Sequence, residues 1–74
     1  MVDRLKMYIN RLIADSVKRP DATLNLRGQA YGALMFVLED KTLSDGVKTE
    51  LVHFWDGAMK NFNDIYNDYV KENN

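Results

Sequence analysis

The chain has 74 residues, of which 46% are hydrophobic and 28% are charged, and its formal net charge is −1. This length allows one small core and excludes a two-lobed enzyme, and the composition is that of a folded chain rather than a disordered one. A net charge near zero excludes a polybasic nucleic-acid binder. The chain has no cysteine, which excludes disulfides and sulfur-based zinc sites and fits a reducing compartment. We expect one helical domain over residues 1–74.

Neither an export signal nor a membrane span is visible in the sequence. The first six residues alternate apolar and charged side chains, whereas a secretion signal needs a continuous apolar stretch. The longest apolar run, residues 33–38, is far shorter than the roughly 20 residues that span a bilayer. These patterns predict a cytoplasmic protein without a membrane partner.

The first segment carries apolar residues at three- and four-residue spacing, which is typical of one face of a helix. The residues of this face are Val2, Leu5, Ile9, Leu12, Ile13, Ser16 and Val17. Pro20 lacks an amide hydrogen and disfavours helical geometry in the residue before it. The spacing therefore predicts a helix over residues 2–18.

The second segment predicts a helix over residues 22–40. The residues that define its inner face are Leu24, Tyr31, Leu34 and Leu38, which share one side at helical spacing. Either Asp21 or Thr23 is expected to cap its N-terminus. Because the apolar arc is wide, we expect a central helix that is contacted from two sides.

The third segment has the clearest pattern, a 4-3-4-3-4 spacing of apolar residues. These residues are Leu51, Trp55, Ala58, Phe62, Ile65 and Tyr69. With Ser44 or Thr42 as the cap, the pattern predicts a helix over residues 44–70, about 39 Å long at 1.5 Å per residue. The three segments together predict an all-α protein, a compact three-helix antiparallel bundle with a long C-terminal helix.

The sequence does not contain a combination of residues that favours catalysis. Glu50 and His53 have the spacing of a metal-binding pair, but they fall on the polar side of their helix and have no further ligands. His53 and Asp56 could contact each other, but no nucleophile is near them in the sequence. We therefore expect neither an enzyme, a metal site, a cofactor nor a small-molecule substrate.

Two glycines in the second helix, Gly28 and Gly32, predict the close approach of another helix. They lie four residues apart on one face, and each destabilises a helix interior by roughly 1 kcal/mol relative to alanine. Met35 and Phe36 lie on the same side, which makes this face a poor surface for a monomer. The alternative is that the bundle itself buries the helix on three sides.

The third helix is too long for the two shorter helices to cover. Either it breaks at Gly57, or its distal half packs on another chain, and the unbroken spacing favours the second option. We therefore expect a small non-enzymatic protein–protein interaction module that forms a homodimer through this helix or binds another protein. The residues expected to contact the partner are Phe62, Ile65, Tyr66, Tyr69 and Val70, joined by Met35 and Phe36.

A basic stripe on the first helix supports an alternative function. Arg4, Arg11 and Lys18 recur every seven residues, and Arg19 follows them. Such a stripe suits contacts with phosphates, so the alternative is a nucleic-acid-associated regulator. A solvated helix face would have the same pattern.

Overall fold

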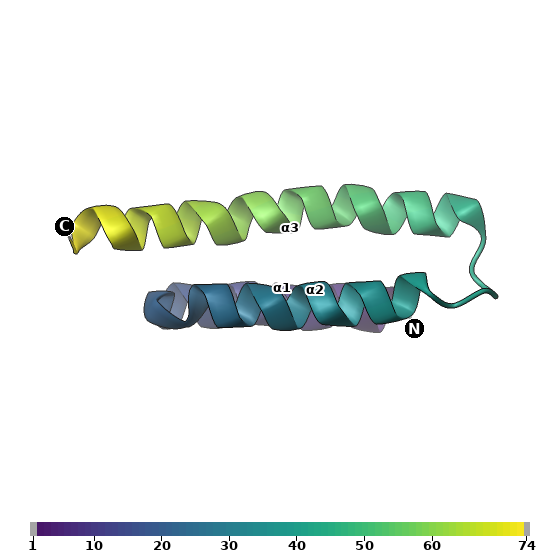
Figure 1. The fold of residues 1–74 in the computed structure, drawn as a ribbon, viewed down its shortest axis with the longest axis horizontal. Coiled ribbons are helices and arrows are strands. Elements are labelled where there is room, and N and C mark those ends of the chain that lie inside the picture. Colours follow the sequence, from purple (N-terminus) through teal and green to yellow (C-terminus); the bar gives the residue numbers. More distant parts are fainter. Residues whose placement is uncertain (1, 74) are drawn as a thin grey trace.

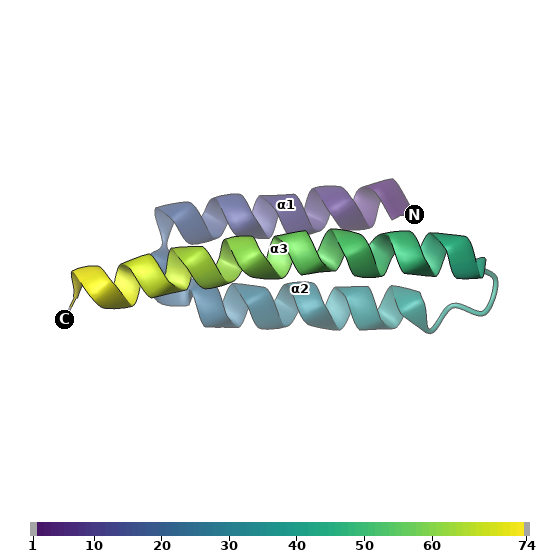
Figure 2. The same cartoon turned by 90° about the horizontal axis from the view of Figure 1, so that it is seen from above.

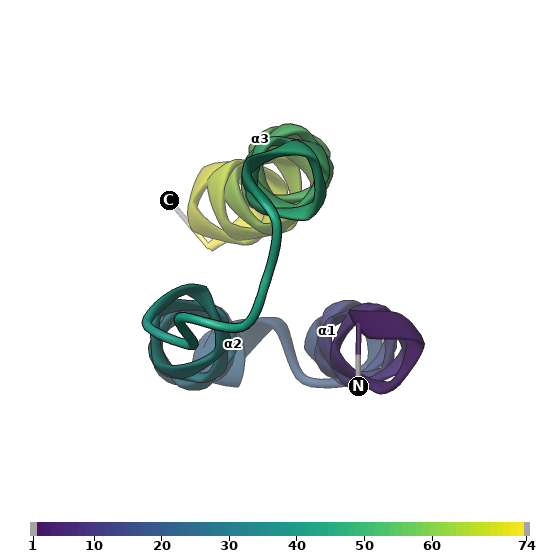
Figure 3. The ribbon, with the colours of Figure 1, turned by 90° about the vertical axis from the view of Figure 1, so that its right-hand side faces the viewer.

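The structure is a computed structural model that describes residues 2–73. In this range the chain forms α1 (Val2–Lys18), α2 (Thr23–Leu38) and α3 (Asp45–Glu72), with a short 3-10 helix η1 (Pro20–Ala22) before α2. Successive helices run in opposite directions (Figure 1), and each helix contacts the other two. The view along the bundle in Figure 3 shows the helices at the corners of a triangle. The predicted all-α antiparallel bundle is therefore confirmed.

The helix ends lie within two residues of the predicted ones. α3 begins after Ser44, whose Oγ accepts a hydrogen bond from the Val47 N–H at 3.2 Å and satisfies an otherwise free donor of the first turn. At the start of α2 the prediction was wrong, because neither Asp21 nor Thr23 caps this helix. Instead, the Thr23 hydroxyl donates to the Pro20 carbonyl at 2.7 Å, inside the turn that η1 forms.

All three helices contribute to one core. Its fully or nearly fully buried apolar residues are Leu5, Ile9 and Leu12 from α1, Ala30, Leu34 and Val37 from α2, and Leu51, Trp55, Ala58 and Phe62 from α3. In α1 and α3 the buried side is the one that the apolar spacing predicts, except that Val17 at the end of α1 is 65% exposed. The Trp55 ring lies 6.4 Å from the Phe62 ring, centroid to centroid, in the tilted arrangement that aromatic pairs favour.

α2 is rotated relative to the prediction. Its buried apolar residues Ala30, Leu34 and Val37 face α1 and α3, whereas Leu24 and Tyr31, both predicted to face inward, are about half exposed. Leu34 is buried and Leu38 is packed against the core, as predicted, so the buried side of α2 overlaps the predicted side only in part.

α3 is continuous through Gly57 and is the longest element of the bundle. Its 28 residues extend over about 42 Å at 1.5 Å per residue, nearly the whole 46 Å length of the molecule. Figure 2 shows that its C-terminal end passes beyond the turn between α1 and α2. Within residues 2–73, no helix has both the length and the apolar character needed to cross a membrane.

Candidate interaction surface

The outer side of α2 has no charged side chain. Arg27 is the one charged residue among the 16 of this helix. Its Nη1 donates a hydrogen bond to Oδ1 of Asn63 at 2.7 Å, which turns the guanidinium toward α3 and away from the outer side. The polar residues that remain on the outer side are the neutral Asn25 and Gln29. A solvent-facing helix usually carries charges on this side, so α2 is unusual.

Four large apolar side chains of α2 are exposed on this side. Phe36 is 79% exposed, Tyr31 50%, Leu24 45% and Met35 39%. Single exposed apolar side chains are common on protein surfaces, but four on a helix side without charge are unusual. We refer to Leu24, Gly28, Tyr31, Gly32, Met35 and Phe36 as the α2 face.

The two glycines of the α2 face are open to solvent. A Cβ placed on Gly28 or Gly32 would have no atom within 4 Å, apart from its own helix and its chain neighbours. The bundle therefore does not use these glycines for close packing, and the alternative that it buries α2 on three sides is wrong. No helix of this chain packs closely on the two glycines, so a helix that approaches them would have to belong to another chain.

A shallow groove connects the α2 face to α3. It has a volume of about 260 Å³, and its lining residues are Leu24, Arg27, Gly28, Tyr31, Trp55 and Met59. The Tyr31 ring lies 5.8 Å from the Trp55 ring, centroid to centroid, at 50° to it. Tyr31 therefore connects the core to the exposed surface, because one side of its ring packs on Trp55 while half of the residue is open to solvent.

The predicted contacts at the end of α3 are less exposed than expected. Phe62 is 0% exposed and belongs to the core, so its prediction as a partner contact is corrected: this side chain is already covered by the chain itself. The side chains of Ile65, Tyr66, Tyr69 and Val70 are half-buried. The cause is the turn between α1 and α2, because η1 contacts α3 and extends the cover beyond the ends of the two shorter helices.

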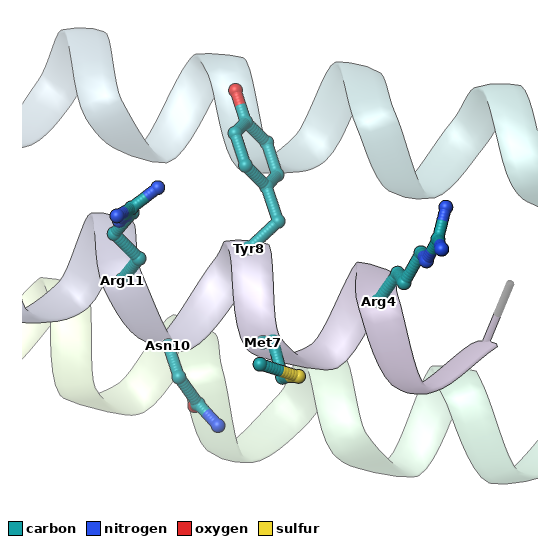
Figure 4. Close-up of a pocket in the computed structure, with 5 residues that line it drawn as sticks. All are labelled: Arg4, Met7, Tyr8, Asn10 and Arg11. Carbon is teal, nitrogen blue, oxygen red and sulfur yellow. The ribbon is translucent and has the colours of Figure 1, made fainter.

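The predicted basic stripe lies on the exposed side of α1. Arg4, Arg11, Lys18 and Arg19 are all exposed, and none forms an ion pair within the described residues. Arg4 and Arg11 line an open depression of about 620 Å³ together with Met7, Tyr8 and Asn10. Figure 4 shows Arg4, Tyr8 and Arg11 extending from one edge of α1, whereas Met7 and Asn10 lie along its other edge. Lys18 and Arg19 do not line this depression.

Glu50 and His53 do not form a site together. Glu50 forms an ion pair with Lys6 of α1, and the Lys6 ammonium also lies 5.6 Å from the centre of the Phe54 ring. His53 is exposed and lines a separate open groove between α1 and α3. No group of three or more histidine, aspartate or glutamate side chains in residues 2–73 is placed to hold a metal ion.

One carboxylate has a shifted pKa. The pKa of Asp40 lies below its ordinary value, first because the Thr42 hydroxyl donates to Oδ1 at 2.7 Å and second because the Thr42 N–H donates to the same oxygen at 2.9 Å. These hydrogen bonds favour the ionised form and shape the loop between α2 and α3. They have a structural rather than a chemical role.

Sequence reasoning found half of the apolar side chains of the α2 face and missed the other half. Met35 and Phe36 were predicted as partner contacts, but Leu24 and Tyr31 were assigned to the core. A signal for them was present, since a helix with one charged residue in 16 has no polar side to turn toward solvent. Comparison of the chain with family models, curated proteins and solved structures gave no match.

Proposed function

We propose that this protein is a small non-enzymatic interaction module and that the α2 face is the surface through which it binds a protein partner. The observation that carries the proposal is the combination of four exposed apolar side chains with the absence of charge on that side of α2. Water contacts this area at a free-energy cost of about 25 cal/mol for each Å² of apolar surface. A partner that covers the α2 face would remove that cost.

The α2 face is a better contact surface than the end of α3. Phe36 alone is 79% exposed, whereas the side chains of Ile65, Tyr66, Tyr69 and Val70 are half-buried within the chain. Large aromatic side chains are enriched in protein interfaces, where they supply much of the binding free energy. Phe36 is the side chain that best fits this description.

Site-specific photo-crosslinking tests this function. A benzophenone amino acid replaces Phe36 in one variant and Met7 in a control, in the cells that make the protein. Both positions are well exposed, at 79% and 71%, but only Phe36 lies on the α2 face. We expect a discrete crosslinked protein product from position 36 and much less from position 7. Equal yields of protein product from the two positions would contradict the proposal.

The depression on α1 supports a second candidate function, binding to nucleic acid. Arg4 and Arg11 are exposed, and the 41% exposed Tyr8 lies between them on the same edge of the helix (Figure 4). Two guanidinium groups beside an aromatic ring provide contacts for phosphates and a surface on which a base can stack. The net charge of −1 makes any such binding weak and local.

Retention on DNA or RNA at increasing salt concentration tests the second candidate. Phosphate contacts release counterions, so the binding constant should fall steeply as salt rises. The comparison is between the parent chain and a variant with Arg4→Gln and Arg11→Gln. Retention that is absent at low salt, or that is equal for the two chains, would exclude this function.

A further inference from the structure

The apolar α2 face contains a row of residues with a symmetric order of sizes. Leu24, Gly28, Gly32 and Phe36 follow one another at four-residue intervals, so they form one ridge along the helix surface. All four are exposed. The order is large, small, small, large from either end. The midpoint of the row lies on the outer surface, at the same level along the helix axis as residue 30. The sequence of side-chain sizes is therefore the same whether the row is followed toward the C-terminus or toward the N-terminus.

From this row we propose that the partner of the α2 face is α2 of a second copy of the same chain. The inference rests on the proposed function and names the occupant of the same surface. In a twofold-symmetric interface, residue i of one copy contacts residue j of the other, and j contacts i. The row is inclined by about 26° to the helix axis, and a twofold axis through its midpoint, perpendicular to the row, places Leu24 opposite Phe36 and Gly28 opposite Gly32. The two helices then run antiparallel.

The sizes in the row fit two helices that cross at an angle. Helices that pack through ridges of four-residue spacing cross at about −50°, so the gap between them is smallest at the crossing point and widens on both sides. Gly28 and Gly32 lie at the crossing point, where the absence of Cβ atoms allows the closest approach. Leu24 and Phe36 lie about 9 Å from that point along the axis, where large side chains fill the wider gap.

The charges on and near the α2 face are also compatible with a second copy. A twofold axis places each side chain near its own kind, so a charged face would repel itself in a symmetric dimer. The α2 face has no charged side chain, because Arg27 is held by Asn63 at 2.7 Å on the α3 side. The nearest acidic residues in the chain, Asp21 and Glu39, lie just beyond the two ends of α2, where crossing helices diverge.

The available area predicts a weak dimer. The outward half of α2, about 24 Å long and 10–12 Å in diameter, offers roughly 400–500 Å² of accessible surface. Two copies would bury at most about 800–1,000 Å² in total, which is at or below the lower limit for a specific interface. The half-buried Met59 of α3, which lines the groove beside Leu24, Gly28 and Tyr31, can add to this area. We therefore expect a dissociation constant of roughly 1–100 μM, the range of transient complexes.

Sedimentation equilibrium of the purified chain over a concentration series from low micromolar to about 1 mM tests the proposal. The parent chain should change from 8.6 kDa to twice that mass as the concentration rises. A variant with Gly28→Ala and Gly32→Ala adds Cβ atoms at the crossing point, so its dissociation constant should rise at least tenfold. A non-specific apolar contact would respond in the opposite way, because alanine is more apolar than glycine.

The control for the glycine variant is Gly57→Ala. Gly57 is also a helical glycine with no atom within 4 Å of a built Cβ, but it lies on α3, away from the α2 face. All these alanines should raise the melting temperature of the monomer by a few degrees, since alanine favours the helix. Only the Gly28 and Gly32 substitutions should weaken association. Equal dissociation constants for the parent and the Gly28/Gly32 variant would overturn the proposed crossing.

A second pair of variants keeps the proposal falsifiable if the glycine variant aggregates. Phe36→Lys and Met7→Lys each place a charge at a well-exposed apolar position, so both should remain folded. Phe36→Lys should raise the dissociation constant more than a hundredfold, because it buries an unpaired charge in the interface, and Met7→Lys should leave it unchanged. A parent chain that is monomeric at 1 mM overturns the dimer. If position 36 then still crosslinks to a different protein, the proposed function survives while this inference fails.

Discussion

α1 and α2 are almost equal in length, and each packs one side on the same core, but their outer sides differ. On α1, charged residues, among them Asp3, Arg4, Arg11 and Lys18, face the solvent beside the exposed apolar side chains of Met7, Tyr8 and Val17. On α2, the corresponding side has neutral and apolar residues, and the one charged residue is turned toward α3. The outer side of α1 is thus charged, as is usual for a solvated helix, whereas the outer side of α2 is uncharged, which agrees with the proposed role of the α2 face in binding.

This difference shows that a helix needs two kinds of residue to define its orientation in a bundle. In α1 the charged residues must face the solvent, so the opposite side of the helix must be the buried one. α2 has apolar residues around most of its circumference, so its apolar residues alone do not distinguish the core side from the outer side.

Trp55→Ala should destabilise the fold by about 3–5 kcal/mol, because it removes the largest side chain of the core and leaves a cavity. Trp55 is 9% exposed and contacts Tyr31, so it forms the boundary between the core and the α2 face. Urea denaturation measures the free energy of unfolding. Val52→Ala, at a 47% exposed position of the same helix, is the control and should cost much less. Similar losses for the two variants would contradict the orientation of α3.

Leu34→Ala and Phe36→Ala compare the inner and outer sides of α2 directly. Leu34 is 2% exposed and Phe36 is 79% exposed, although they are two residues apart. Leu34→Ala should cost about 2–5 kcal/mol and Phe36→Ala less than about 0.5 kcal/mol. The free energies of unfolding should be measured at a protein concentration below the dimer range. A larger loss for Phe36→Ala would mean that α2 is rotated the other way.

Replacing Arg4, Arg11 and Lys18 by alanine tests the claim that the outer side of α1 is a solvated surface. All three are exposed, and none forms an ion pair within residues 2–73. The summed loss of stability should stay below about 1 kcal/mol, most of it from Lys18, whose charge favours the C-terminal end of α1. Circular dichroism during thermal unfolding measures the effect. A large loss of helix content would show that these side chains support the fold.

Asp40→Asn should have the smallest effect and tests the loop that follows α2. The pKa of Asp40 is lowered in the folded state, chiefly by the hydrogen bond from the Thr42 hydroxyl. The stabilisation is therefore present above the ordinary aspartate pKa and is lost as the pH falls through the lower, folded-state pKa. At neutral pH the variant should be slightly less stable than the parent, and the difference should shrink in strong acid. A difference that does not change with pH would exclude this cause.

The sequence predicted α1 and α3 well and α2 only in part. In α3 the apolar series through Leu51, Trp55 and Phe62 alternates with polar residues, so both the helix and its buried side follow from the spacing. In α2 the helix and the inward position of Leu34 were predicted correctly, but Leu24 and Tyr31 were wrongly assigned to the core, because they have the same apolar character as Leu34. The near absence of charge in α2 indicates that some apolar residues are exposed, but it does not indicate which ones.

The sequence also did not predict how little of the C-terminal end of α3 is exposed, and the reason is different. The exposure of this end depends on how far the turn between the other two helices reaches, and this is a property of the packed bundle. The 3-10 turn Pro20–Ala22 contacts α3 and covers part of its distal half. The lengths of the helices alone therefore predicted too much exposed apolar surface at the distal end of α3. The Phe62 side chain, for example, is completely buried.

The short connections of the bundle have a kinetic consequence. Residues 19–22 connect α1 to α2, and residues 39–44 connect α2 to α3, so each helix packs on its neighbours in the chain. Helical proteins with such local topology fold within about microseconds to milliseconds. Before the chain folds, the residues that later form the core are exposed to solvent only briefly. The tendency to aggregate is therefore set by the apolar residues that stay exposed after folding. Phe36→Lys should raise the solubility limit while leaving the refolding rate almost unchanged.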